Sequence, residues 1–386
     1  MNNTLHTFFL LNPDITFLNH GSFGACPQPV FEAYQRWQRE LEWQPVEFLG
    51  RRFDDLMREA RSVLANFVGA DADEITYVTN ATVGLNTIAR SLDLRPGDEV
   101  VTTDHEYGAL DRTWRFLCEK SGAQYIRQPI GVPIENADAA IEAVWAAVTD
   151  RTRALFLSHI TSPTAITLPV KPLIDRARER GILTIIDGAH AVGQIDLNLH
   201  DLGADFYSSN CHKWLMSPKG SAFLYARRAV QHLVEPLVVS WGWQSEKPSS
   251  SRFIDEQEWQ GTRDIAAYLS VPAAIKFFRD QDWPSVRQQC HALVRYARQQ
   301  ATALTGLPSF TPDDAAWFSQ LSLLPLPPCD LAALKTRLYD EYHIEIPVIR
   351  WNDRYGVRIS IQGYNTAADV DALIAALRTL LPRVSL

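Results

Sequence analysis

The sequence lacks an apolar run long enough to cross a membrane. Its longest apolar stretches, such as residues 182–186, fall far short of the roughly 20 residues that a membrane helix needs. Residues 1–11 have no charged region ahead of an apolar core, which distinguishes them from a secretory leader. We therefore expect a cytoplasmic protein that does not bind membranes.

Cysteine and positive charge are also scarce. The five cysteines are odd in number, widely spaced and free of any C-x-x-C pair, so the pattern favours neither a disulfide framework nor a zinc cage, and we expect no metal. The formal net charge is −8, from 37 Lys and Arg against 45 Asp and Glu, and no basic run offsets it locally. Such a chain repels a phosphate backbone at long range, so nucleic acid is not an expected partner.

Two nucleotide-binding motifs are missing as well. No G-x-G-x-x-G or Walker sequence follows a strand pattern, which disfavours dinucleotide and nucleoside-triphosphate binding. The chain does have 386 residues, 46% of them apolar, and can therefore bury a large core. We expect a large domain over residues 1–265 and a smaller one over residues 266–386.

The order of strand and helix patterns predicts the fold class. Strands are expected at residues 74–79, 98–104, 123–129, 153–160, 182–187, 205–210 and 221–226, with helices at 82–92, 109–121, 137–148 and 171–180 among them. This alternation is typical of an α/β fold whose mainly parallel, seven-stranded sheet is covered on both faces. Later come helices at 266–279, 285–304, 331–342 and 367–381 and strands at 317–323, 344–349 and 357–361, which predict a small α+β domain.

Asp187 and Lys213 are the most informative pair of residues. Asp187 ends an apolar strand pattern, at the edge where open α/β sheets bind ligands, and Lys213 follows the next expected strand. A lysine that forms a Schiff base with pyridoxal phosphate needs an acid that faces the cofactor's ring nitrogen, and this pair offers both groups. Taken alone, Asp187 is more typical of a helix N-cap or a turn after a strand, and Lys213 would suit a loop at the sheet edge.

Three other segments follow expected strands. Residues 79–86 lie between a strand and a helix, where free backbone N–H groups attract an anion, although Asn80 or Thr82 also suits a plain N-cap. Tyr107 is placed to stack on a planar cofactor or to fill the core under a loop. His190 is placed to reach a phenolic oxygen of that cofactor or to be a structural imidazole.

These pieces together resemble the class V aminotransferase family of fold-type I pyridoxal-phosphate enzymes, over nearly the whole chain. The similarity is greatest to the isopenicillin N epimerase-like branch. The strings that carry it are LNHGSFG at residues 18–24, PVEFLGRR at 45–52, DHEYGA at 104–109, QGTRD at 260–264 and VRISIQGYN at 357–365. Five matches in the same order are far more specific than any one of them.

The resemblance implies a role for each matching residue toward pyridoxal 5'-phosphate. Lys213 would form the internal aldimine, Asp187 would bind the pyridinium nitrogen, and Tyr107 would stack on the ring. The remaining cofactor contacts would come from Ala81, Thr82, Ser162, His190, Asn210, His212 and Thr262. Ser162 stands where desulfurases have an asparagine, so that direct contact to a cofactor oxygen is lost or passes through water.

The resemblance also implies a small amino-acid substrate and a partner subunit. Arg358 matches the arginine that grips the substrate carboxylate with a bidentate fork, and His20 and Arg350 are expected near the substrate end. Thr262 matches the residue that reaches the phosphate of the neighbouring subunit. That match implies a homodimer with shared active sites.

The resemblance leaves the reaction open among several that begin with an external aldimine and a quinonoid at the substrate Cα. We rank epimerisation first, C–S β-elimination of the cysteine desulfhydrase or sulfoxide lyase type second, then transamination, and a non-catalytic α/β binding protein last. Epimerisation needs an acid opposite Lys213, for which Tyr107 and His105 are the candidates. Residues 350–355 lack the cysteine that desulfurases carry there, which disfavours a protein persulfide.

Overall fold

The seven strands expected in the large domain form one sheet in the computed structural model, which describes residues 4–386. They are β2 (Ile75–Val78), β3 (Glu99–Thr103), β4 (Gln124–Gln128), β5 (Thr152–Ser158), β6 (Leu183–Asp187), β7 (Phe206–Asn210) and β8 (Ala222–Ala226). Their order is β2-β8-β7-β6-β5-β3-β4, and only β8 runs antiparallel to its neighbours. The predicted α/β fold with a mainly parallel sheet is therefore confirmed.

Helices cover both faces of this sheet. In β6, Ile185 joins the apolar cluster that contains residues of α5 (Ala81–Ser91) and α6 (Gly108–Ser121). The next residue, Ile186, joins the cluster on the other face, with residues of α4 (Phe53–Val68), α7 (Ala137–Trp145) and α8 (Val170–Glu179). Because successive strand residues point to opposite faces, a strand that is apolar throughout must be covered on both sides.

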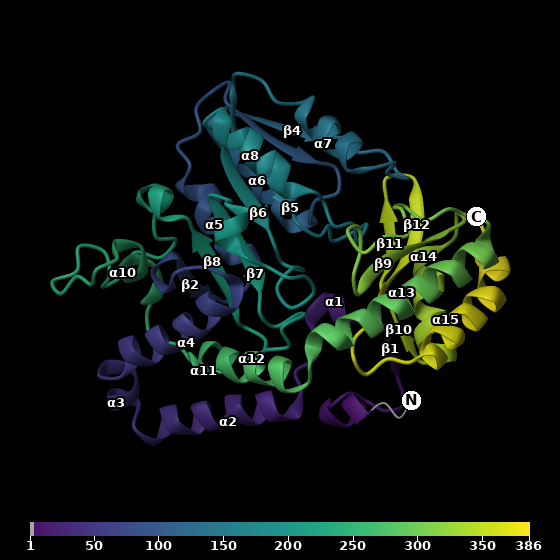
Figure 1. Ribbon diagram of the computed structural model, residues 1–386, viewed down its shortest axis with the longest axis horizontal. Helices are drawn as coiled ribbons and strands as arrows, with labels where there is room; N and C mark the ends of the chain where they lie inside the picture. Colours follow the sequence, from purple (N-terminus) through teal and green to yellow (C-terminus); the bar gives the residue numbers. More distant parts are fainter. Residues whose placement is uncertain (1–3) are drawn as a thin grey trace.

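The smaller lobe contains a three-stranded antiparallel sheet in the order β11-β12-β9. Its strands are β9 (Leu321–Leu326), β11 (Val348–Trp351) and β12 (Arg354–Ser360), and its helices are α13 (Trp283–Thr305), α14 (Leu331–Tyr342) and α15 (Ala367–Leu380). Figure 1 shows this lobe beside the large one, with α13 running along it. The expected small C-terminal α+β unit is present.

The chain passes between the two lobes after β1 (Thr16–Phe17) and again between α12 (Val271–Asp280) and α13. The N-terminal strand β1 pairs with β10 (Ile344–Glu345) of the smaller lobe. The helix expected at 266–279 is divided into α11 (Ala266–Leu269) and α12, with Pro272 in the first turn of α12. Both pack on α2 (Gln28–Trp43) and α4 of the large lobe, so the smaller lobe begins at α13 rather than at residue 266.

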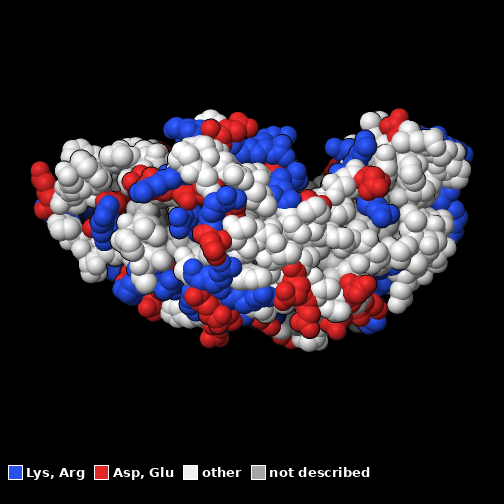
Figure 2. All heavy atoms as spheres, turned by 90° about the horizontal axis from the view of Figure 1, so that it is seen from above, with Lys and Arg blue, Asp and Glu red and all other residues white. Residues whose placement is uncertain are grey.

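The remaining elements are short. They are α1 (His20–Phe23), α3 (Pro45–Gly50), α9 (Leu199–Leu202), α10 (Arg252–Glu258) and four 3-10 turns, η1 (Thr4–Phe8), η2 (Ala72–Glu74), η3 (Arg228–Leu233) and η4 (Leu381–Arg383). The face drawn in Figure 2 mixes acidic and basic side chains and is hollowed between the two lobes. No described helix combines the length and apolarity needed to span a bilayer.

Candidate active site

A cavity of about 690 Å³ lies where the sheet's carboxyl edge meets the smaller lobe. The large lobe contributes the segments that follow β2, β3, β5, β6 and β7, and the other walls come from α1 and β12. Because parallel strands end at the same edge, residues far apart in sequence meet there. The cavity brings together most of the predicted site residues: Ala81, Thr82, Tyr107, Ser162, Asp187, His190, Asn210, His212, Lys213 and Arg358.

Lys213 presents its amine to this cavity without an ion-pair partner among residues 4–386. Its Nζ lies 3.3 Å from Nε2 of His190. Burial and, after it, the nearby Arg358 cation lower the pKa of Lys213 to about 7, although Asp187 opposes both effects. A large share of the amine is therefore neutral near pH 7, as a nucleophile or a base must be.

Asp187 is a buried carboxylate at the end of β6. Its Oδ1 accepts a 2.9 Å hydrogen bond from the backbone N–H of Ala189, and within the described chain it forms no ion pair. Burial raises its pKa to about 6, while that hydrogen bond and Lys213 lower it. A protonated ring nitrogen placed here would give this carboxylate the cationic partner that it lacks.

The start of α5 forms a different end of the cavity. Asn80 caps the helix by accepting a 2.9 Å hydrogen bond from Val83 N, and Asn210 Oδ1 accepts one of 2.9 Å from Ala81 N. Asn210 thus holds the helix start in place as well as lining the cavity. Thr82 follows in the first helical turn, where the helix dipole favours an anion.

His212 and Gly24 complete that end. Nδ1 of His212 donates a 3.0 Å hydrogen bond to the Ser221 carbonyl, and burial lowers the pKa of His212 to about 4. Gly24 has a φ of 70°, and a Cβ there would lie 1.9 Å from the His212 carbonyl oxygen. Glycine therefore allows the segment after α1 to close against the lysine-bearing loop.

Arg358 extends from β12 as a buried cation that forms no carboxylate pair within residues 4–386. Its Nη1 donates to the backbone carbonyl of Ser162 at 2.6 Å, and its Nη2 donates to Ser22 Oγ at 3.2 Å. Its Nε has no hydrogen-bond partner in the described chain. Burial lowers the pKa of Arg358 only to about 10, so the side chain stays charged and suits a carboxylate ligand.

His20, one of the predicted site residues, does not line the cavity. His20 is fully buried, with Nδ1 3.0 Å from Tyr364 Oη and Nε2 3.0 Å from the Lys213 carbonyl oxygen. Burial lowers its pKa to about 3. It supports the backbone of Lys213, and the substrate contact predicted for it is not made through this wall.

His105, predicted as a candidate acid, does not line the cavity either. Its Nδ1 lies 2.7 Å from Thr164 Oγ1, its Nε2 donates to the Ile130 carbonyl at 2.9 Å, and its ring centroid lies 4.3 Å from that of Trp351. Both nitrogens face protein atoms in a fully buried position. The prediction of His105 as a candidate acid opposite Lys213 is therefore wrong, and Tyr107 remains.

Arg350 and Thr262 are exposed and do not line the cavity. Arg350 lies on β11, with its Nε 3.3 Å from the Asn352 carbonyl oxygen. Thr262 lies in the turn after α10. The role predicted for Thr262 concerns a second subunit and stays a prediction, as does the substrate contact of Arg350.

The sequence reasoning missed several residues that support the site. Trp214 donates from Nε1 to Nδ1 of His190 at 3.2 Å, and Ser22 contacts Arg358 as described above. Glu106 accepts hydrogen bonds from Ser158 Oγ at 2.6 Å and from Thr103 Oγ1 at 2.8 Å, and burial raises its pKa to about 7. Trp214 directly follows Lys213 and Glu106 directly precedes Tyr107, so adjacency was the available signal.

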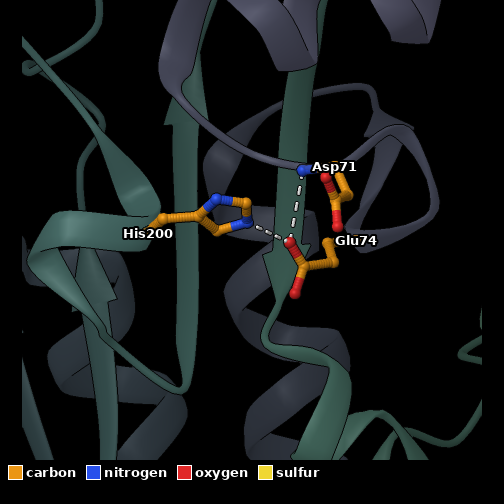
Figure 3. Close-up of side chains that lie close together, drawn as sticks. All are labelled: Asp71, Glu74 and His200. Carbon is orange, nitrogen blue, oxygen red and sulfur yellow. Dashed lines mark hydrogen bonds and ion pairs between the residues drawn. The ribbon is translucent and has the colours of Figure 1, made fainter.

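Metal-ligating side chains gather at one place away from the cavity. Figure 3 shows Asp71, Glu74 and His200, whose potential ligand atoms lie within 4.8 Å of one another. Glu74 Oε2 lies 2.7 Å from His200 Nε2, and the side chain also accepts from the backbone N–H of Asp71 at 3.2 Å and of Arg228 at 3.1 Å. Arg228 forms a further ion pair with Asp71, so the cluster has a structural explanation as a capped turn.

The walls of the cavity fit the polar groups of pyridoxal phosphate. The start of α5 suits its phosphate, the buried carboxylate of Asp187 suits its ring nitrogen, and the amine of Lys213 suits its aldehyde. Arg358 remains as an anion-binding group for a substrate. Each assignment matches a cofactor or substrate group to a protein group whose charge or hydrogen-bonding capacity is not fully used by other residues of the described chain.

Comparison with known proteins places the chain in one family. The family model described as Aminotransferase class-V matches residues 24–373. An isopenicillin N epimerase of Amycolatopsis lactamdurans is 35% identical over 384 residues, with 96% of both chains covered. A protein of Oryza sativa subsp. japonica, called putative L-cysteine desulfhydrase 1, is 30% identical, with 94% of this chain and 83% of that protein covered.

Solved structures share the fold. The cysteine desulfurase CsdA of Escherichia coli has a TM-score of 0.81 at 22% identity, with 100% of this chain and 99% of that chain covered. The cystine C–S lyase C-DES, in complex with its product cysteine persulfide, has a TM-score of 0.80 at 22% identity, with 95% and 98% covered. At this identity the likeness establishes the fold and leaves the reaction open.

Proposed function

The chain belongs to the class V aminotransferase family of pyridoxal-phosphate enzymes, and we propose that it epimerises a small amino acid at Cα. The observation that carries this proposal is one cavity that joins a largely neutral lysine, a buried acid and a buried arginine with a free N–H group. Similarity to isopenicillin N epimerases over 96% of the chain supports it.

Each of these three residues has a distinct task. Pyridoxal phosphate, when bound, withdraws electrons from the substrate Cα and so makes its proton acidic. The guanidinium of Arg358 binds the substrate carboxylate and orients Cα toward Lys213. The neutral amine of Lys213 accepts the Cα proton, and the carboxylate of Asp187 holds a proton on the ring nitrogen.

Epimerisation also requires a proton donor that is distinct from Lys213. Tyr107 is the candidate, because it lines the cavity and its side chain is partly open, with 45% of its surface exposed. It sits at the N-cap of α6, whereas Lys213 follows β7, so the two groups come from separate elements. Lys213 would remove the Cα proton from one face, and delivery of a proton from Tyr107 Oη to the opposite face of Cα would invert the configuration.

The second candidate is C–S β-elimination. Similarity over 94% or more of this chain to proteins named as putative or probable L-cysteine desulfhydrases favours it, and elimination needs only one base and a leaving group. All five cysteines lie within the described residues, and none of them lines the cavity. A sulfide released here would leave without passing through a protein persulfide at the cavity wall.

We further propose that two copies of the chain share their active sites. Thr262 is exposed and away from its own cavity, as a residue that serves a partner's site must be. Large apolar side chains are also exposed on the same lobe, among them Trp43 at 90% and Trp241 at 84%. A second subunit would cover such surface.

The test is incubation of the purified protein, with pyridoxal phosphate, with a panel of L-amino acids in deuterated water. Epimerisation predicts deuterium at Cα with inversion and no keto acid. Pyruvate with sulfide would instead indicate the lyase, and keto acid with pyridoxamine phosphate would indicate transamination. Tyr107→Phe separates the first two outcomes, because it abolishes inversion and leaves elimination.

Matched lysine variants show whether the assigned lysine is correct. Lys213→Ala removes all turnover and the borohydride-sensitive visible absorption. Lys171→Ala is the control, because Lys171 lies on α8 in an exposed pair with Asp175 and should leave both unchanged. Turnover by Lys213→Ala, or protein that stays colourless with added cofactor, would overturn the proposal.

A further inference from the structure

His190 lies between the catalytic lysine and a buried tryptophan. Its Nε2 is 3.3 Å from Lys213 Nζ, and its Nδ1 is 3.2 Å from Trp214 Nε1. Lys213 and Trp214 are adjacent in sequence, so the two ring nitrogens of His190 contact side chains that are separated by a single peptide bond. No other residue bonds to either ring nitrogen of His190 within the part of the chain that is described.

The chemistry of these groups decides where the hydrogens lie. An indole N–H can only donate, so Nδ1 of His190 must accept with its lone pair. In a neutral imidazole the proton then sits on Nε2 and points at Lys213. The amine of Lys213 can accept that hydrogen bond only when it is neutral, because an ammonium has no lone pair.

Trp214 is held so that this donor cannot turn away. Its side chain is fully buried, and its ring centroid lies 5.1 Å from that of His20. A Cβ at Gly21 would lie 3.3 Å from the indole, and one at Gly193 would lie 2.5 Å from the Trp214 carbonyl carbon. Two glycines therefore let neighbouring segments close on this residue, and Gln194 Nε2 also anchors the His190 carbonyl at 2.7 Å.

We propose that Trp214 is a positioning residue, which fixes His190 in its Nε2–H tautomer and through it holds Lys213 as a neutral amine that faces the cavity. This inference rests on the proposed function, in which Lys213 binds the cofactor and moves the Cα proton. From its sequence position alone, Trp214 would be interpreted as a residue that only packs in the core.

The charges around Lys213 agree with this arrangement. Arg358 faces it across the cavity and disfavours the ammonium form, while Asp187 favours that form. A protonated His190 would add a second cation at 3.3 Å, and burial with Lys213 and Arg358 nearby holds the pKa of His190 well below its usual value. Trp214 therefore determines which of the two neutral tautomers His190 adopts.

The direct test is ¹⁵N NMR of the full-length protein with labelled histidine, before and after loading with pyridoxal phosphate. His190→Gln identifies the His190 signals by their loss. The wild-type protein before loading should show a bare Nδ1 and a protonated Nε2 at neutral pH. A protonated Nδ1 in that protein would overturn the inference without any variant having to fold.

Trp214→Phe tests the consequence for the lysine. Without the indole donor the imidazole can place its proton on Nδ1 and offer Nε2 as an acceptor, which stabilises the ammonium form of Lys213. Acylation of Lys213 in the protein before loading, followed by mass spectrometry across pH, should show its midpoint moved to higher pH. Reactivity at pH 7 should fall roughly threefold, because the loss of about 1 kcal/mol shifts the protonation equilibrium of a lysine that is about half neutral at that pH roughly fivefold.

Trp114→Phe is the matched control. Trp114 is also fully buried, and its Nε1 has no hydrogen-bond partner within residues 4–386. Both substitutions remove the same volume from the core, but only Trp214→Phe removes a donor to His190. Equal effects of the two variants on the reactivity of Lys213 would indicate that Trp214 acts only through core packing and would overturn the inference.

The outcomes separate this inference from the proposed function. Cofactor uptake and turnover with a protonated Nδ1 at His190 would leave the function intact and overturn the role of Trp214. The predicted tautomer in a protein that neither binds cofactor nor turns over would support the hydrogen-bond arrangement and overturn the function.

Discussion

The guanidinium of Arg358 donates a 2.6 Å hydrogen bond to the backbone carbonyl of Ser162 and so joins the two lobes across the cavity. Arg358 belongs to β12 of the smaller lobe, and Ser162 follows β5 of the large one. A buried side chain held in this way loses little freedom when a carboxylate binds. The position of the lobes and the substrate binding that we propose for Arg358 are therefore linked through one residue.

Arg358→Lys should weaken substrate binding without loss of the cofactor. A lysine keeps the charge, but it offers neither the planar fork nor the reach to both Ser162 and a carboxylate. We expect kcat/KM for amino acids to fall roughly a hundredfold, mainly through KM, because a charged hydrogen bond contributes about 3 kcal/mol. Steady-state kinetics with absorbance of the bound cofactor checks this, and unchanged KM would contradict it.

Cofactor uptake should depend on pH near neutrality. Since the pKa of Lys213 is lowered to about 7, its amine is protonated below that pH and neutral above it. The rate of appearance of the visible cofactor band should rise as pH increases through 7 and then level off. An ordinary lysine, with a pKa near 10.4, would give a rate that keeps rising about tenfold per pH unit up to pH 10.

Asp187→Asn should stabilise the protein before cofactor loading and abolish turnover. The folded-state pKa of Asp187 is raised from 3.8 to about 6, so burial of its charge destabilises the fold fully above pH 6, and this penalty shrinks as pH falls from 6 towards 3.8. We expect Tm to increase by about 2 °C at pH 8 and by about half as much at pH 5. Differential scanning calorimetry at both pH values measures this, and an equal shift at both would contradict it.

Complementation between variants should show whether the sites are shared. Lys213→Ala and Thr262→Val are each expected to be impaired as homodimers, the latter through weaker phosphate binding. If Thr262 serves the partner's cavity, a mixed dimer contains one site with both native residues. Co-expressed and separated mixed dimers should then have about half of wild-type activity. Activity no greater than that of the Thr262→Val homodimer would place Thr262 in its own site.

The strand ends were predictable from sequence because their signal is local. An apolar strand that stops at a polar residue places that residue at the sheet edge, as Asp187 shows, and Lys213 lies just beyond the end of the neighbouring strand β7. Tyr107 and Thr82 follow the same rule after β3 and β2. The cofactor assignment needed more, namely the ordered motif strings that indicate the family.

The histidines were harder because a motif does not show which way a side chain points. His20 and His105 both belong to the diagnostic strings, but one supports the backbone of Lys213 and the other is buried against Trp351. Trp214 likewise reads as a core residue until its hydrogen bond to His190 is seen. Contacts between segments, such as Ser22 with Arg358, depend on how the lobes dock.

The amino-acid order was sufficient for the α/β sheet and the family and for proposing Lys213 as the cofactor lysine, since each depends on local periodicity or on residues adjacent in the chain. Folding was needed to bury Lys213 beside Arg358 and to place an imidazole, oriented by Trp214, against its amine. Burial and hydrogen-bond direction are properties of the packed molecule. They lower the pKa of the Lys213 amine from the ordinary lysine range to about 7.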